Sequence, residues 1–452
     1  MSAGERPWSG RTIHFVGVGG AGMSAYARVA HELGAHVSGS DRASTPYLER
    51  LRDDGVLVPL LGHAPAHVPA GEHVELVYSS AVPAENPERV RARERGLQER
   101  SRADLLAELT AMRRTIAVAG SHGKTTTASM LVHALRAAGL DPGWLVGGMI
   151  GEGLPNGRWG GGEWIVVEAD ESDRSMLELS VEIAVLTNVE LDHADAYGSL
   201  ADLRAAFREL LAHAPMAVIW DRAELLALRD GPLVAYDVEE LSLRPEGSRS
   251  RWHGHELTLA VPGAHNALDA VAALEAALLA GAGESQLAGA LASFRGAGRR
   301  FQLLGRGPGG ALLYDDYAHH PSEIAATLAG ARLQVPRGGR LIAVFQPHLF
   351  SRTRALAREL GCALAGADVV AVLDVYAARE RAEEHVGVSG LMVAEATSEN
   401  AHGRPVYWLP GFDDAEPMLR GLLRDGDVCV VMGAGDVDEL ARRLARSAEA
   451  GE

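Results

Sequence analysis

The sequence predicts an α/β protein built mainly from parallel sheets. Short apolar runs alternate with helix-period segments along almost the whole chain of 452 residues, a pattern typical of parallel strands joined by helices. Glycine-rich turns join two of these runs directly to helices. Polar and acidic residues follow several other runs. Because ligands bind at the carboxyl ends of parallel strands, these residues are the candidates for a functional site.

The composition limits the class of protein. The length allows two to four domains, and 47% apolar residues are ample for their cores. A net charge of −17 disfavours non-specific binding to nucleic acid or to an anionic membrane. Residues 1–11 lack an apolar secretion signal, and no apolar run approaches a membrane span. We therefore expect a cytoplasmic protein, with Cys362 and Cys429 as buried free thiols.

The first glycine-rich turn has the sequence G-V-G-G-A-G at residues 17–22. It follows an expected strand at Thr12–Val16 and precedes a helical pattern that begins at Met23. In this fingerprint the missing side chains let the backbone approach a pyrophosphate. Asp41 follows a second expected strand, at the position where such a fold holds a ribose. The fingerprint alone fits an NAD site and a UDP-sugar site equally well.

The next expected strand, Val74–Tyr78, ends at Ser79 and Ser80, which places both serines on the binding edge. A charged helix is expected over residues 88–100, with most of its charges facing solvent. A domain boundary is expected near residue 110.

The second glycine-rich turn is the stretch A-G-S-H-G-K-T-T-T at residues 119–127, between a strand at 115–118 and a helix that ends before Gly139. Unpaired N–H groups and the dipole at a helix start favour an anion. Lys124 adds a point charge for a terminal phosphate, and the hydroxyl of Thr125 can hold Mg²⁺. Val118 stands where the common phosphate loop has its first glycine.

Lys124 is the only lysine of the chain, and every other residue counted as Lys or Arg is arginine. An arginine fork is larger than an ammonium group and does not replace it in a tight loop. Retention of one lysine at this position therefore predicts nucleotide-phosphate binding.

Acidic residues follow two further strands. Residues 168–173, E-A-D-E-S-D, carry four carboxylates that repel one another unless a cation or donors offset them. Residues 187–195 repeat the arrangement and include His193. We expect a metal site here rather than a solvated acidic loop, although a lone histidine is an unusual ligand for Mg²⁺.

The remaining polar motifs lie in the second half of the chain. Asn266 stands near the start of an alanine-rich helix, where it could contact a base edge. The basic glycine loop at 294–301 fits an interdomain linker and an arginine donor to phosphates equally well. Strands are expected at 311–314, 341–345, 369–375 and 428–432, and Pro321 suits the first turn of a helix.

Taken in order, these motifs resemble the Mur ligases from residue 13 to about residue 435. The motifs that carry the resemblance are residues 17–23, 120–127, 168–173, 188–197, 265–267, 298–301, 315–323 and 346–350. The resemblance implies three domains: a UDP-sugar-binding Rossmann-like domain (1–110), a central P-loop ATPase domain (111–298) and a C-terminal Rossmann-like domain (299–452). It also favours a UDP-sugar over NAD at the first glycine turn.

The implied reaction belongs to peptidoglycan synthesis. ATP phosphorylates the lactyl carboxylate of UDP-N-acetylmuramate, and the amine of L-alanine then displaces phosphate. The implied UDP-sugar residues are Gly17, Gly19, Gly20, Gly22, Asp41, Ser79 and Ser80. The implied ATP residues are Gly120, Ser121, His122, Gly123, Lys124, Thr125, Thr126, Asn266 for adenine, Arg300 for a phosphate and Asp316 for ribose. Two Mg²⁺ sites are implied, with Thr125, Glu168 and His193 as ligands.

Tyr317, His348 and Arg352 are the implied amino-acid residues, and Lys124, Glu168, His193 and Arg352 the implied catalytic ones. Some relatives carry an arginine where this chain has Leu349, which leaves one donor fewer for the amino acid. Some relatives that add later residues use a carboxylated lysine, which a chain with one lysine cannot supply. That difference favours the alanine-adding branch.

Three alternatives remain open at this stage. They are a related ligase that recycles a tripeptide, a nicotinamide-linked oxidoreductase and an inactive regulatory binder. The closely spaced Ser175-Met176-Leu177 after the acidic loop favours the alanine branch over the recycling one. A monomer or a homodimer is expected, with no nucleic-acid or membrane partner.

Overall fold

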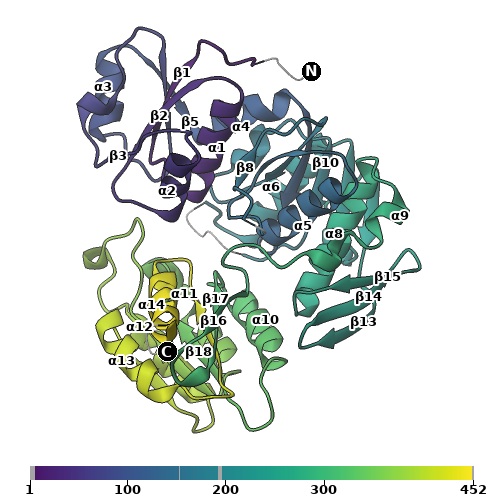
Figure 1. The fold of residues 1–452 in the computed structure, drawn as a ribbon, viewed down its shortest axis with the longest axis vertical. Helices are drawn as coiled ribbons and strands as arrows, with labels where there is room; N and C mark the ends of the chain where they lie inside the picture. Colours follow the sequence, from purple (N-terminus) through teal and green to yellow (C-terminus); the bar gives the residue numbers. More distant parts are fainter. Residues whose placement is uncertain (1–5, 152, 192–195, 450–452) are drawn as a thin grey trace. The chain divides into compact units, whose positions relative to one another are not determined.

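The computed structural model describes residues 6–151, 153–191 and 196–449 (Figure 1). The chain divides into two compact units. The first unit comprises residues 1–238 and 268–294, and the second comprises residues 239–267 and 295–452. No helix within the described residues is long and apolar enough to cross a membrane.

The first sheet of the first unit has the strand order β3-β2-β1-β4-β5, and all its neighbouring strands are parallel. Its strands are β1 (Thr12–Val16), β2 (His36–Asp41), β3 (Leu60–Leu61), β4 (Val74–Tyr78) and β5 (Gln98–Ser101). The accompanying helices are α1 (Ala21–Glu32), α2 (Pro46–Asp53), α3 (Pro87–Glu94) and α4 (Arg102–Ala111), with a short 3-10 turn η1 (Pro65–His67). The strand order reverses between β1 and β4, so the glycine turn after β1 lies at the expected binding position.

The charged helix expected over residues 88–100 is shorter than predicted. Gly96 has a φ of +65°, a left-handed conformation that ends α3 and that glycine adopts readily. The chain then continues as the edge strand β5, which pairs with β4. Charged residues on an edge strand keep it from pairing with other chains. Because β5 carries such charges, its sequence resembles the solvated helix that was predicted.

The second sheet of the first unit has the strand order β12-β11-β10-β6-β9-β7-β8, and only the β7–β8 pair is antiparallel. Its strands are β6 (Arg114–Ala119), β7 (Gly143–Leu145), β8 (Gly157–Arg158), β9 (Trp164–Glu168), β10 (Ile183–Leu186), β11 (Met216–Trp220) and β12 (Leu233–Tyr236). The helices that follow these strands are α5 (Lys124–Ala137), η2 (Ser175–Glu178), α6 (Leu200–His213), α7 (Ala223–Leu226), α8 (Ala264–Leu279), α9 (Glu284–Leu287) and η3 (Ala290–Ser293). The phosphate-loop motif follows β6, between the ends of β10 and β9.

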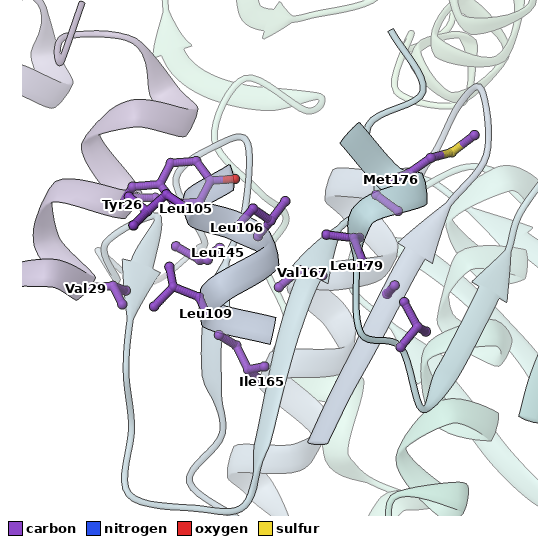
Figure 2. Close-up of a cluster of buried hydrophobic side chains, with 14 of the residues drawn as sticks. Tyr26, Val29, Leu105, Leu106, Leu109, Leu145, Ile165, Val167, Met176 and Leu179 are labelled. Carbon is purple, nitrogen blue, oxygen red and sulfur yellow. The ribbon is translucent and has the colours of Figure 1, made fainter. Parts of the chain in front are cut away.

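Helix α4 joins the two sheets of the first unit through one hydrophobic cluster. Figure 2 shows Leu105 and Leu109 of α4 beside Tyr26 of α1 and beside Ile165 and Val167 of β9. All five side chains are almost fully buried. Burial of a large apolar side chain contributes about 1.5–3 kcal/mol, so this helix is firmly held at its apolar face.

The second unit contains a three-stranded antiparallel sheet and a six-stranded, mainly parallel sheet. The strands of the smaller sheet are β13 (Glu239–Arg244), β14 (Gly247–Trp252) and β15 (His255–Leu259). The larger sheet has the order β16-β17-β21-β18-β19-β20. Its strands are β16 (Gln302–Arg306), β17 (Leu312–Asp316), β18 (Leu341–Phe345), β19 (Val369–Val372), β20 (Val406–Trp408) and β21 (Val428–Met432). The helices are α10 (Pro321–Arg332), α11 (Phe350–Leu364), α12 (Gly390–Asn400), α13 (Phe412–Leu422) and α14 (Val437–Glu449), with short turns η4 (Pro308–Gly310) and η5 (Ala382–Glu384).

Two local expectations in the second unit are tested by these elements. Pro321 is the first residue of α10, as predicted. The prediction that both cysteines are buried is wrong for Cys362, which is exposed on α11, and right for Cys429 in β21. A helix presents residues all around its axis, so apolar neighbours in sequence do not bury every position.

Candidate active site

The first glycine turn is held by side chains from the end of β2 and the start of α2. The N–H of Gly19 donates to Asp41 Oδ2 at 2.8 Å, and Thr45 Oγ1 donates to the carbonyl of Gly19 at 2.7 Å. A Cβ added to Gly19 would lie 2.9 Å from Asp41 Oδ2, so only glycine fits without displacement. Gly17 has a φ of +82°. The turn is thus fixed at the carboxyl edge of the sheet, with Gly20 as its exposed residue.

The two serines predicted for this site follow the neighbouring strand. The N–H of Ser79 donates to the carbonyl of Val16 at 3.1 Å. A Cβ on Gly17 would lie 3.2 Å from the Cβ of Ser79, which places this serine against the turn. Ser80 is the next residue and is exposed. The structure therefore gathers Gly17, Gly19, Gly20, Gly22, Asp41, Ser79 and Ser80 at one edge, as the sequence predicts.

The phosphate-loop motif is held by the residues that end β10. The N–H of His122 donates to Asn188 Oδ1 at 2.9 Å, and Thr187 Oγ1 donates to the carbonyl of His122 at 2.6 Å. Gly120 has a φ of +132°, and a Cβ there would lie 2.1 Å from Thr187 Oγ1. Sequence reasoning assigned Asn188 and Thr187 only to an acidic stretch, whereas the structure shows them fixing the loop.

Lys124 begins α5 and reaches back over the loop. Its Nζ donates to the carbonyl of Gly120 at 2.6 Å and to that of Ser121 at 3.2 Å. Its ion pair is with Glu171, whose two carboxylate oxygens lie 2.9 and 2.7 Å from Nζ. Burial lowers the pKa of Lys124, but the charges of Glu171 and Asp170 outweigh it, so the net shift is upward and the ammonium stays charged.

The acidic loop, residues 168–173, begins at the last residue of β9 and distributes its carboxylates among different partners. Glu168 Oε1 accepts the N–H of Gly147 at 2.7 Å, and a Cβ on Gly147 would lie 2.9 Å from Oε2. Asp170 and Asp173 accept hydrogen bonds from Arg102 at 3.2 and 2.6 Å. Burial raises the pKa of Asp170, but the Arg102 and Lys124 charges outweigh it and hold that pKa well below its usual range. Four carboxylates are therefore tolerated because donors and cations offset most of their repulsion.

The chemistry of this region fits a hard divalent cation. Magnesium takes oxygen ligands, and both the Glu168 carboxylate and the Thr125 hydroxyl offer oxygen within the same unit. Thr125 lies in the first turn of α5, next to Lys124. His193, the third expected ligand, lies outside the described residues.

The second unit holds the other predicted site residues. Asp316 ends β17, and its carboxylate accepts the N–H groups of Phe301 at 2.6 Å and Ala318 at 2.7 Å. The expected strand end at residue 314 is two residues too early, because Asp315 and Asp316 belong to β17 itself. The guanidinium of Arg300 lies 5.0 Å from the centre of the Tyr317 ring, within the range of a cation–π interaction.

The amino-acid residues predicted in this unit include a contacting pair. An Nη atom of Arg352 lies 3.2 Å from His348 Nδ1, and Arg352 is 9% exposed. Separately, Asn266 Nδ2 donates to the carbonyl of Pro262 at 2.6 Å, within the first turn of α8. Burial lowers the pKa of its neighbour His265 to about 4, so that this imidazole is neutral at pH 7. Sequence reasoning gave His265 no role.

Three family models match successive segments of the chain. Family models match residues 12–114 (Mur ligase family, catalytic domain), 118–277 (Mur ligase middle domain) and 299–435 (Mur ligase, glutamate ligase domain). The UDP-N-acetylmuramate–L-alanine ligase of Mycobacterium sp. (strain JLS) is 40% identical over 486 residues, covering 100% of this chain and 98% of the relative. The ligase of that name from Mycobacterium avium (strain 104) is 42% identical over 487 residues, covering 98% and 97%.

Two solved structures extend the likeness to the fold. The UDP-N-acetylmuramate–alanine ligase MurC of Thermotoga maritima matches with a TM-score of 0.83 at 28% identity, covering 98% of this chain and 100% of that one. A murein peptide ligase of Psychrobacter arcticus matches with a TM-score of 0.73 at 25% identity, covering 97% and 98%. These matches confirm the predicted three-domain α/β fold with mainly parallel sheets, while the proposed domain boundaries remain predictions. The chain belongs to the Mur ligase family.

Proposed function

We propose that this chain ligates L-alanine to the lactyl carboxylate of UDP-N-acetylmuramate, with ATP converted to ADP and phosphate. The observation that carries the proposal is the identity of 40–42% to ligases of that activity over nearly the full length. The site supports it independently, because Lys124 lies on a fixed glycine loop beside the acidic residues that a phosphoryl transfer needs. The product is a precursor of peptidoglycan.

The proposed chemistry has two steps. An oxygen of the sugar carboxylate attacks the γ-phosphorus of ATP, the bond to the β-phosphate oxygen breaks, and ADP leaves. The amine of L-alanine then attacks the acyl phosphate, an amide bond forms, the carbon–oxygen bond to phosphate breaks, and the amine loses its proton. Both steps build negative charge between crowded anions, so positioned cations are the main catalytic requirement.

Each group of residues has a proposed task in these steps. Lys124 exchanges part of its contact with Glu171 for the β- and γ-phosphates of ATP. Glu168, Thr125 and His193 would hold Mg²⁺, which when bound neutralises phosphate charge. Asn266, Arg300 and Asp316 are the proposed contacts for adenine, phosphate and ribose. Tyr317, His348 and Arg352 are the proposed contacts for L-alanine, with the Arg352 guanidinium on its carboxylate.

Several finer expectations belong to the same proposal. We expect two Mg²⁺ ions during turnover, a cytoplasmic protein, and a monomer or homodimer. We expect the site to prefer L-alanine over glycine only modestly, because one methyl group is worth about 1–3 kcal/mol.

The experiment that tests the proposal measures phosphate release from ATP and Mg²⁺ with UDP-N-acetylmuramate. The acceptors compared are L-alanine, glycine, L-serine and the tripeptide that the recycling ligase would use. Release that needs the sugar nucleotide and is fastest with L-alanine supports the proposal. Release only with the tripeptide would assign the chain to the recycling branch. No release with any acceptor would indicate a regulatory binder.

A further inference from the structure

Arg102 lies between the first glycine turn and the acidic loop. It is the first residue of α4, and one Nη donates to Asp173 at 2.6 Å and to Asp170 at 3.2 Å in the acidic loop. A Cβ placed on Gly22, at the start of α1, would lie 3.5 Å from its other Nη. One guanidinium therefore borders both the first glycine turn and the acidic loop.

The position of this arginine is unfavourable for a purely structural residue. The N-terminus of a helix carries a partial positive charge, which opposes a cation in the first turn. The Nε of Arg102 is buried and has no hydrogen-bond partner among the described residues. An unpaired buried donor destabilises the fold unless another state of the protein supplies an acceptor. An anion bound beside this guanidinium would offset the unfavourable charge at the helix start.

The acidic loop carries the contact onward to the phosphate loop. Asp170 and Asp173 flank Glu171, and Glu171 holds Lys124 by two short contacts. Tyr197 fixes the loop from the other side, because its hydroxyl donates to the carbonyl of Glu171 at 2.9 Å. A change in the partners of Arg102 would therefore alter the charge around the loop that holds Lys124.

Helix α4 itself provides a fixed base for this contact. Its apolar face, including Leu105, Leu106 and Leu109, is packed in the cluster of Figure 2 against α1 and β9. The helix cannot shift without disrupting that packing, whereas the guanidinium of Arg102 stands on a long side chain that can turn towards either neighbour. The guanidinium is therefore the movable element between the two parts of the site.

We propose that Arg102 is a positioning residue that couples sugar-nucleotide binding at the first glycine turn to nucleotide binding at the phosphate loop. The inference rests on the proposed function, because it takes residues 17–22 as the diphosphate site. A diphosphate beside Gly22 attracts the guanidinium and weakens its bonds to Asp170 and Asp173. The acidic loop then attracts Mg²⁺ more strongly, so that the sugar nucleotide tightens Mg·nucleotide binding, and the reverse holds by linkage.

Arg11 offers a matched control at the other end of the same helix. Its guanidinium also holds two carboxylates, Glu75 at 2.7 Å and Glu108 of α4 at 2.5 Å. The variants Arg11→Gln and Arg102→Gln each remove one arginine that holds two carboxylates and joins α4 to another segment. Only the second removes the arginine that borders the glycine turn.

The test is calorimetric titration of the full chain with a non-hydrolysable ATP analogue and Mg²⁺, with and without saturating UDP-N-acetylmuramate. For the unmodified chain and for Arg11→Gln we expect the sugar nucleotide to lower the Kd of the analogue at least fivefold, the lower end of typical coupling. For Arg102→Gln we expect the ratio to fall below two. Arg102→Lys should give an intermediate ratio, because one ammonium cannot reach both sides.

The outcomes separate this inference from the proposed function. Failure of the unmodified chain to bind UDP-N-acetylmuramate or to release phosphate with it would overturn the proposed function. A chain that binds both ligands but shows no coupling, or an Arg102→Gln variant that keeps the full coupling, would overturn the inference alone. If Arg102→Gln does not fold, Asp173→Asn gives the same test, because it keeps the arginine and removes its shorter ion pair. The same loss of coupling is then expected, and unchanged coupling would overturn the inference.

Discussion

The two glycine turns of the first unit use the same backbone geometry for different tasks. Each follows a central strand of a parallel sheet, each contains a glycine with positive φ, and each has a threonine that donates to one of its carbonyls. They differ in the source of the cation. The phosphate loop contains Lys124, whereas the first turn contains no basic residue and is bordered by Arg102 from α4.

This difference matches what each phosphate group must do in the proposed reaction. A transferred phosphoryl group needs a compact charge that follows it as bonds form and break. A diphosphate that is only held needs backbone N–H groups and a donor that can bind more than one oxygen. The comparison teaches that a strand–glycine–helix turn indicates anion binding, and that the placement of the cation indicates the chemistry.

The largest expected effect comes from Lys124→Arg. The wider guanidinium does not fit among the carbonyls of Gly120 and Ser121 and the carboxylate of Glu171. We expect phosphate release to fall by a factor of about 100 to 1,000, since one such cation is worth about 3–4 kcal/mol in a transition state. The Kd for UDP-N-acetylmuramate should stay within about twofold of its original value. A fully active arginine variant would refute the assignment of this loop, and Arg114→Lys, at an exposed ion pair with Glu182, is the control.

A smaller and selective effect is expected from adding one methyl group to either turn. Gly120→Ala would place a Cβ 2.1 Å from Thr187 Oγ1, and Gly19→Ala would place one 2.9 Å from Asp41 Oδ2. Strain of about 1–3 kcal/mol in a turn weakens the binding of the ligand held there by roughly 5- to 150-fold. We expect Gly120→Ala to weaken the ATP analogue and Gly19→Ala to weaken the sugar nucleotide, as measured by calorimetry. Equal losses of both ligands in either variant would contradict separate sites.

The support beneath the first turn should depend on pH. Glu88 is fully buried, and its carboxylate lies 2.8 Å from His14 Nε2, 2.8 Å from Ser40 Oγ and 3.1 Å from His63 Nδ1. Burial raises the pKa of Glu88, but the bonds from His14 and Ser40 outweigh it and lower that pKa from 4.5 to about 2. Because the folded pKa is the lower one, this stabilisation is present above pH 4.5 and is lost as the pH falls towards 2.

The measurement for Glu88 is urea unfolding at several pH values between 3 and 7, for the original chain and for Glu88→Gln. The variant should lose about 3 kcal/mol of unfolding free energy at neutral pH. Its unfolding free energy should also fall less steeply than that of the original chain as the pH drops below 4.5. An equally steep loss of unfolding free energy at acid pH in the variant and in the original chain would show that groups other than Glu88 cause that loss.

The smallest expected effects come from the two threonines that hold the turns. Thr45 Oγ1 donates to Gly19 O and accepts the N–H of Leu48 at the start of α2, and Thr187 Oγ1 donates to His122 O. Replacement of either by valine keeps the shape and removes hydrogen bonds worth about 1 kcal/mol each. Thr45→Val should weaken the sugar nucleotide a few-fold, and Thr187→Val should do the same to the ATP analogue. Weaker binding of the ATP analogue by Thr45→Val, or of the sugar nucleotide by Thr187→Val, would contradict the assignment of one ligand to each turn.

The sequence was sufficient for features that depend on local pattern. The two glycine turns follow apolar strands as expected, and the strand ends Val16, Phe345 and Met432 coincide with the expected ones. Glu168, expected just after a strand, is instead the last residue of β9. Backbone freedom at glycine and alternation of apolar segments act over a few residues, so one chain reveals them. The roles proposed for His193, which lies outside the described residues, and for the remaining site residues stay predictions.

Other features depend on contacts between distant segments and could not be read from one sequence. Glu171 and Asp170 have the same charge and stand side by side, yet Glu171 holds Lys124 while Asp170 pairs with Arg102. Arg102 belongs to no motif of the sequence, and the role proposed for it depends on the packing of α4 between two sheets. The exposure of Cys362 depends on which side of α11 faces the core.

The central claim is that the two turns bring a phosphoryl group of ATP to the carboxylate of the sugar nucleotide. The most direct test uses UDP-N-acetylmuramate labelled with ¹⁸O in its lactyl carboxylate, together with ATP, Mg²⁺ and L-alanine. An acyl phosphate transfers one carboxylate oxygen to phosphate, so we predict that each phosphate released carries one ¹⁸O atom. Unlabelled phosphate would mean that water receives the phosphoryl group, which would contradict the account.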